Sequence, residues 1–323
     1  MAQSVFEKEY IISPDYCDAA AAMSPLAAFT IFQAMAAEHA EQIGVGGMAM
    51  AKRGEFWLTV HTRIDFFSRA RLMDTVTAAT WPEQCANEAY RCFRSYSLKQ
   101  GEKLIALGRT QWAILGSGGK LMHFGDTGFP KNFDYSPMQG ITDSPARFAD
   151  DFGEDDFAFE YTVRSTDIDF GQHMNNVCYA RLALDCLSAK EIASGKIKFA
   201  EIHFSAPSLE GERLRVYKKA DGNALYVCIK KPGQGRNAAA APVALQGHTD
   251  MVCEKNSGVE HDFLRDPIPY YRDGDWVRAR GTTLGADNGV AVAMMLGILD
   301  DQTTPHPPLE CLFTSQEELG LDG

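Results

Sequence analysis

The sequence lacks the features that mark membrane-spanning and disulfide-bonded proteins. None of its apolar runs approaches the roughly 20 residues that cross a bilayer, and its opening MAQSVFEKEY contains no apolar signal segment. Its eight cysteines are scattered and form no CxxC pair, which favours reduced thiols over disulfides or a cysteine-rich metal site. We therefore expect a cytoplasmic protein.

Basic residues are also scarce. Lys and Arg number 31 against 43 Asp and Glu, so the formal net charge is −12. Nucleic acids and anionic membranes are bound by basic surfaces, so this balance excludes both as expected partners. The 45% hydrophobic content is ample for packed cores. At about 100–200 residues per domain, a chain of this length predicts two or three domains.

An internal repeat runs through the first two thirds of the chain. The segment YIISPDYCDAAAAMSPLAAF is matched later by YTVRSTDIDFGQHMNNVCYARL. A shift of 151 residues aligns five pairs: Tyr10 with Tyr161, Asp18 with Asp169, Ala22 with His173, Met23 with Met174 and Ser24 with Asn175. Self-similarity at a long period indicates two copies of one structural unit.

Each copy has the pattern of a helix followed by strands. Ser24 and Pro25 predict the start of a mostly apolar helix that ends at Gly44. Four strand-like segments follow, at 56–66, 74–81, 90–98 and 104–115. The second copy predicts a helix over 176–193 and strands at 197–204 and 213–217, with a further strand possible at 225–229. We expect an antiparallel sheet wrapped around each helix.

Polar residues cluster just before the helix of the second copy. Asp169, His173 and Asn175 lie at its predicted N-terminus, where unpaired N–H groups and the positive end of the helix dipole can stabilise an oxyanion. Asp169 can activate water or attack a carbonyl directly, and His173 can orient or shuttle a proton. The alternative is purely structural, with Asp169 and Asn175 capping the helix and His173 lying at the surface.

Residues 1–220 resemble the bacterial and plant acyl-acyl-carrier-protein thioesterases, which are double hot-dog proteins. The motif TDIDFGQHMNNVCY carries the resemblance, together with FWLTVHTRIDF, Thr80-Trp81 and RTQWAIL. The resemblance implies hydrolysis of a fatty acyl thioester in the second copy, with Asp169 and His173 at catalytic positions and a non-catalytic first copy that has Ala22 in place of the histidine.

The chain departs from the family pattern at two positions. The family's catalytic asparagine falls on Gly171, and its acidic or thiol residue on the next strand falls near Pro207 and Ser208. Glu201 and His203 lie on the neighbouring predicted strand and are candidates to substitute for it.

The pattern changes abruptly after residue 220. A short buried strand at 242–245 leads to His248 and Asp250, and an apolar helix at 288–299 follows Asp287. A second apolar strand at 309–313 runs into Glu317 and Glu318. Histidine and carboxylate side chains at strand and helix ends are typical of a zinc site with nitrogen and oxygen ligands. Alone, each of these residues is equally typical of a polar surface.

This segment closely resembles the di-zinc aminoacyl-histidine dipeptidases. The matching motifs are LQGHTDMV, HDFLRDPI, ARGTTLGADNGVAVA and EELGLDG. The resemblance implies that His248, Asp287 and Glu318 are metal ligands, that Asp250 orients His248 and that Glu317 is the general base. The sequence ends at Gly323, without the family's later ligands. Because a catalytic zinc normally needs three protein ligands, we expect weak zinc binding at best and no peptidase activity.

The predicted fold is α+β, with tandem hot-dog units followed by an incomplete α/β zinc-peptidase fragment. The predicted domains are a non-catalytic hot-dog at 1–125, a linker at 126–156, a catalytic hot-dog at 157–220 and a truncated peptidase-like segment at 221–323. The second hot-dog is expected to lack at least one strand.

The expected function is a thioesterase acting on acyl carrier protein or coenzyme A conjugates, without a cofactor and as a possible homo-oligomer. A dipeptidase fragment and a non-enzymatic scaffold are the alternatives.

Overall fold

The computed structural model describes residues 4–146, 148, 150–232, 243–301 and 304–314. It divides into an N-terminal unit that ends at Lys230 and a C-terminal unit that begins at Lys231. Among the described residues, no helix has the length and apolar character that crossing a bilayer requires.

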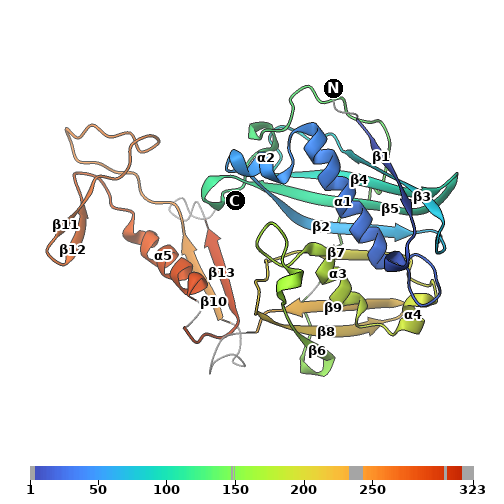
Figure 1. Ribbon diagram of the computed structural model, residues 1–323. Coiled ribbons are helices and arrows are strands. Elements are labelled where there is room, and N and C mark those ends of the chain that lie inside the picture. The colour runs from blue at the N-terminus through green and yellow to red at the C-terminus, as the bar shows by residue number, and fades with distance from the viewer. Residues whose placement is uncertain (1–3, 147, 149, 233–242, 302–303, 315–323) are drawn as a thin grey trace. The chain divides into compact units, whose positions relative to one another are not determined.

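A six-stranded antiparallel sheet forms most of the N-terminal unit. Its order is β1-β3-β4-β5-β2-β7, and the strands span Phe6–Ile11 (β1), Phe56–Phe66 (β2), Thr75–Pro82 (β3), Arg91–Gln100 (β4), Lys103–Leu115 (β5) and Phe199–His203 (β7). The first five come from the first copy, and β7 comes from the second. The pairing of β2 with β7 therefore joins the two copies through one continuous sheet (Figure 1).

Helix α1 (Pro25–Ile43) lies across this sheet and supplies much of its core. Its ends follow the sequence: the Ser24 hydroxyl accepts a hydrogen bond from the backbone N–H of Ala27, and Gly44 closes the helix with φ of 87°. Phe32 on α1 stacks on Tyr96 of β4 with ring centroids 4.8 Å apart. Gly108 on β5 makes this contact possible, because a Cβ there would lie 2.6 Å from the Phe32 ring.

The second copy repeats this arrangement in part. Strand β6 (Phe157–Thr162) lies 151 residues after β1, and α3 (Asn176–Leu184) begins 151 residues after α1. Strands β8 (Arg213–Asp221) and β9 (Ala224–Lys230) pair with β6 in the order β6-β8-β9. The two copies thus share the order strand, helix, strands that the repeat predicts, and the α+β hot-dog prediction is confirmed.

The strand counterpart of β5 is not among the described residues of the second copy. Strands β6, β7, β8 and β9 correspond in order to β1, β2, β3 and β4. In the first copy β5 bridges β4 and β2, whereas in the described part of the second copy β9 pairs with β8 and β7 with β2. The N-terminal unit also runs ten residues past the predicted boundary at 220, because β9 pairs with β8 from Ala224 to Lys230.

The prediction of one helix over 176–193 is wrong. The segment forms α3 and a separate short helix, α4 (Ala189–Ala193). Ser188 starts the second helix, because its hydroxyl accepts a hydrogen bond from the N–H of Glu191 and its own N–H donates to the Glu191 carboxylate. This reciprocal capping ends the first helix and begins another. Helix α2 (Gly47–Lys52) follows α1 in the first copy.

The described residues of the C-terminal unit form a small parallel sheet, a hairpin and one helix. Strand β10 (Val243–His248) pairs with β13 (Leu309–Thr314), and α5 (Ala286–Asp300) packs on β10 through Met295. A hairpin of β11 (Tyr270–Asp273) and β12 (Trp276–Ala279) lies between them in sequence. Helix α5 is apolar on all sides, and its Val290, Met294 and Leu296 are exposed. Helices with this pattern are usually buried on several sides.

Candidate active site

The turn that precedes α3 has the same backbone structure as the turn that precedes α1. The N–H of Asp169 donates to the carbonyl of His173 at 3.1 Å, and the N–H of Asp18 donates to the carbonyl of Ala22 at 2.9 Å. Gln172 and its counterpart Ala21 both have positive φ, at 63° and 52°. The repeat found in the sequence is therefore a repeat of one tight turn at the start of a helix.

Asp169 and Asn175 are joined at the N-terminus of α3. The side-chain amide of Asn175 donates to Asp169 Oδ2 at 3.1 Å, while its oxygen accepts from the N–H of Val177 at 2.9 Å. The other carboxylate oxygen, Oδ1, accepts from the N–H of Gly171 at 2.8 Å. Asn175 is thus the helix cap and also holds Asp169, whereas Asp169 itself caps the turn and not the helix. Capping and catalytic positioning are compatible here.

Asp169 and His173 converge on one small space above Gly171. A Cβ built on Gly171 would lie 3.0 Å from Asp169 Oδ1 and 3.1 Å from His173 Nε2. The position that the family fills with asparagine is therefore flanked by both side chains. The two atoms are therefore at most about 6 Å apart, a separation that one water molecule can bridge.

Asp167 anchors this turn, and the sequence analysis gave it no role. Its side chain is 3% exposed and accepts hydrogen bonds from the Tyr161 hydroxyl (2.5 Å), the Arg164 N–H (2.9 Å) and the Arg181 guanidinium (2.8 Å). Its carbonyl also accepts from the N–H of Asn175 at 2.8 Å. The available signal was the first acid of the Asp167-Ile-Asp169 sequence, which the pattern left without a role although a buried carboxylate requires several donors.

These contacts decide the ionisation of Asp167. Burial by itself would raise the pKa of this carboxyl, but the hydrogen bonds from Tyr161, Arg164 and Arg181 outweigh burial and lower it. Nearby, burial raises the pKa of the Cys178 thiol to about 11. Cys178 is therefore a protonated thiol at neutral pH and is unsuited to act as a nucleophile.

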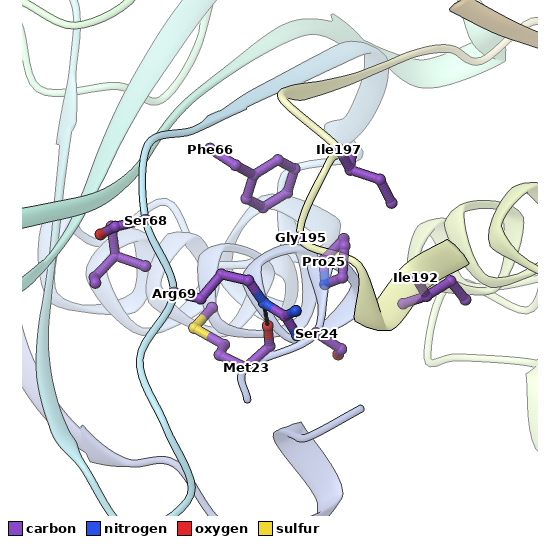
Figure 2. Close-up of a pocket in the computed structure, with 10 residues that line it drawn as sticks. Met23, Ser24, Pro25, Phe66, Ser68, Arg69, Ile192, Gly195 and Ile197 are labelled. Atoms are coloured by element: carbon purple, nitrogen blue, oxygen red, sulfur yellow. Dashed lines mark hydrogen bonds between the residues drawn. The ribbon is translucent and has the colours of Figure 1, made fainter. Parts of the chain in front are cut away.

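The corresponding turn in the first copy is unsuited to activating a water molecule. Asp18, the counterpart of Asp169, forms an ion pair with Arg69, whose guanidinium also donates to the carbonyls of Met23 (3.1 Å) and Ala22 (3.2 Å). Figure 2 shows Arg69 reaching Met23 within a pocket at the start of α1 that Phe66, Ile192 and Ile197 also line. With the carboxylate paired and alanine in place of histidine, this copy lacks a free base.

The family's second acidic position lies beside the turn but carries no acid. Ser208 is buried, its carbonyl accepts from the N–H of Met174 at 2.7 Å, and its hydroxyl accepts from the Tyr179 hydroxyl at 2.9 Å. Pro207 is exposed next to it. Ser208 therefore supports the turn and α3 and supplies no charge.

The suggestion that Glu201 and His203 replace this acid is wrong. On β7, Ala200 and Ile202 pack against the core on the face that α1 covers. Side chains alternate along a strand, so Glu201 and His203 lie on the opposite face of the sheet. There Glu201 contacts His61 of the first copy.

The C-terminal unit brings together the described members of the predicted zinc site. His248 is 4% exposed, and its Nε2 lies 3.3 Å from Asp287 Oδ1. Its Nδ1 lies 3.0 Å from the carbonyl of Asp250 and 3.5 Å from that residue's carboxylate. Glu317 and Glu318 lie outside the described residues. The described residues thus offer two metal ligands here, His248 and Asp287, one fewer than a catalytic zinc normally has.

Asp167→Asn is expected to reduce the free energy of unfolding by about 2 kcal/mol, since it weakens buried hydrogen bonds made to a charged group. Because folding lowers the pKa of Asp167, its carboxylate contributes stability above about pH 4, and this contribution is lost as the pH falls further. Urea denaturation from pH 7 to pH 3 measures both effects. Asp155→Asn, at an exposed position, is the control. Equal stability of D167N and the wild type at pH 7 would contradict the assignment.

Comparisons with known proteins agree with this geometry over the N-terminal unit. The family model for the acyl-ACP thioesterase N-terminal domain matches residues 3–115, and the model for the C-terminal domain of the same family matches residues 152–242. An acyl-ACP thioesterase from Bacteroides thetaiotaomicron superposes with a TM-score of 0.59 at 18% identity, over 71% of this chain and 92% of its own. The 12:0-ACP thioesterase from Umbellularia californica superposes with a TM-score of 0.58 at 15% identity, over 72% and 94% of the two chains. At these identities the two structures show the fold.

A different relative matches another part of the chain. The cytosol non-specific dipeptidase of Escherichia coli is 52% identical over 97 residues, which is 30% of this chain and 20% of the dipeptidase. The chain therefore spans about a fifth of that relative's length. This identity supports a peptidase-like segment fused to the N-terminal unit.

The two domain models together match more than half of the chain, and they follow one another in the order of the two copies. The fold agrees, and the second copy carries, beside the carboxylate that both copies share, the histidine that is alanine in the first copy. The chain belongs to the acyl-ACP thioesterase family and is a fatty acyl thiolester hydrolase.

Proposed function

We propose that Asp169 acts as the general base that activates water for thioester hydrolysis in the second copy, with His173 sharing the water and Asn175 holding the carboxylate. One observation carries the proposal: Asp169 Oδ1 and His173 Nε2 lie 3.0 and 3.1 Å from the same point above Gly171. That point is where a Cβ would bond to Gly171, so the water itself lies beside it, and the two side chains are close enough together for one water to bridge them.

The absence of a side chain at Gly171 supports water in this position. The family's asparagine would fill the space between Asp169 and His173, whereas glycine leaves it open to solvent, since Gly171 is exposed. The departure from the family pattern therefore removes one polar side chain but leaves room for the attacking molecule itself.

The reaction follows from this placement. The water gives a proton to Asp169 as its oxygen forms a bond to the thioester carbonyl carbon. The resulting oxyanion lies near the N-terminus of α3, where the helix dipole favours negative charge. The carbon–sulfur bond then breaks, the proton passes to the leaving thiolate, and the free acid and thiol depart.

The substrate class follows from the family. We infer that the acyl group is delivered on acyl carrier protein or coenzyme A, because both present the same thioester at the end of the same kind of flexible arm. The acidic chain, with a net charge of −12, does not favour the acidic carrier protein by bulk attraction. A panel of acyl thioesters on each carrier identifies the preferred one.

Asp169→Ala is expected to abolish hydrolysis, because it removes the base and leaves the water with the imidazole alone. General-base removal should cost about 100-fold or more in kcat. The assay follows thiol release from acyl-coenzyme A and acyl carrier protein, with Asp155→Ala as the control. Unchanged turnover of D169A, or thioester binding without cleavage by the wild type, would contradict the proposal. The second result would favour the scaffold alternative.

Gly171→Ala tests the water position directly. The added methyl group would lie 3.0 Å from Asp169 Oδ1 and 3.1 Å from His173 Nε2, so it moves both side chains away from the water that they share, and kcat should fall at least about tenfold while the free energy of unfolding changes little. Gly153→Ala is the matched control, because a Cβ there meets nothing within 4 Å. Wild-type kcat in G171A would show that no reacting molecule uses this space.

The peptidase-like segment supports a second candidate activity only in part. We propose that the chain does not hydrolyse dipeptides, because the residues that the structure describes bring together two ligands, His248 and Asp287, and a catalytic zinc normally has three. Incubation of the full chain with a Xaa-His dipeptide and added zinc is expected to release no histidine above the rate of His248→Ala. Release that depends on His248 would contradict this expectation.

A further inference from the structure

Three potential metal ligands lie together on the face of the sheet that points away from α1. His61 on β2 belongs to the first copy, and Glu201 and His203 on β7 belong to the second. One ligand atom of each residue lies within 4.8 Å of the other two. His61 and His203 are directly paired across the strands, with ring centroids 4.6 Å apart.

The geometry of the sheet brings the three side chains of this cluster together. Residues directly opposite one another on antiparallel strands share a face, so His61 and His203 project together, as does Glu201 two residues along β7. A register shift between Thr59 and His61 on β2 changes the alternation at this point. Thr59 consequently faces α3, where its hydroxyl accepts from the Asn176 side chain, while His61 faces away.

The cluster is buried and held by the linker between the copies. The side chains of His61 and Glu201 are 6% and 3% exposed, and His61 Nε2 lies 2.7 Å from Glu201 Oε1. The backbone N–H of Ala146 donates to the same carboxylate oxygen at 2.8 Å, and the Phe148 ring packs edge-on against His203 at 5.0 Å. His203 is exposed and offers a path for an ion.

The positive charge of Arg63, on the same face of the sheet, does not disfavour binding of a metal ion at this cluster. Arg63 follows His61 on the same side of β2, and its guanidinium pairs with Asp65 at 2.9 Å and with Asp143 at 3.3 Å. These two carboxylates offset its positive charge. Two imidazoles and one carboxylate that are already within a few ångströms of one another form a ligand set suited to zinc, with a water in the fourth position.

We propose that His61, Glu201 and His203 bind a divalent transition-metal ion, zinc being the best fit, and that this ion fastens the two hot-dog copies to each other and to the linker. Binding replaces the hydrogen bond between His61 and Glu201 with bonds from both side chains to the metal. The Ala146 N–H remains on the carboxylate and orients it. The role is structural, because the site lies on the opposite face of the sheet from Asp169.

The test measures zinc on the full chain with the peptidase-like site disabled. His248→Ala is stripped with a chelator, dialysed and titrated with zinc alone, by calorimetry and by mass-spectrometric metal analysis. About one zinc per chain is expected to bind. Adding His203→Ala or Glu201→Gln to this variant should weaken binding by about 100-fold, whereas His123→Ala, a histidine of the first copy outside the cluster, should change nothing.

Two results would overturn the proposal. One is the absence of zinc binding by H248A, which would leave the cluster as a hydrogen-bonded pair only. The other is binding that survives both H203A and E201Q, which would place the ion elsewhere. Cobalt(II) bound to H248A provides an independent readout, since a four- or five-coordinate site with nitrogen ligands gives strong visible absorption that H203A should abolish. Because H203A changes an exposed side chain, circular dichroism is expected to show an intact fold.

Discussion

The buried carboxylate of Asp167 is the constraint on which the active site depends. It draws together a tyrosine from β6, a backbone amide from the turn and an arginine from α3, and it can be buried only because all three donate to it. The Asn175 N–H, bonded to the Asp167 carbonyl, then sets where α3 begins. Asp169 is held by Asn175, so its position follows from the same anchor.

The two copies differ in what holds the carboxylate of their shared turn. Both copies fold the same turn at the start of a helix, with a carboxylate at the same place. In the first copy Arg69 binds that carboxylate and the carbonyls around it, which converts the site into a structural ion pair. In the second copy the carboxylate is held by an amide and a backbone N–H, which fix its geometry without neutralising its charge.

Local signals in the sequence predicted the features that depend on neighbouring residues. The 151-residue shift located the turn, and Ser24, Pro25 and Gly44 marked the ends of α1 because caps act within one turn of the helix. The break between α3 and α4 depends on the Ser188 and Glu191 pair, a capping box that an apolar pattern conceals.

Features that depend on distant residues could not be predicted in this way. Glu201 contacts His61, 140 residues away, and the face on which His61 lies depends on a register shift in β2 that no sequence pattern indicated. The same holds for Arg181 and Asp167, whose contact exists only once α3 packs beside β6. Pattern alone therefore left Glu201 as a candidate for the active site, although it lies on the other face of the sheet.

The most direct test of the account is a single turnover of an acyl thioester in water labelled with oxygen-18. If Asp169 activates water beside Gly171, the released fatty acid carries one labelled oxygen from the first turnover and Asp169 carries none, as mass spectrometry of the acid and of the Asp169 peptide will measure. Unlabelled acid, label in Asp169 or no release of acid would contradict the account.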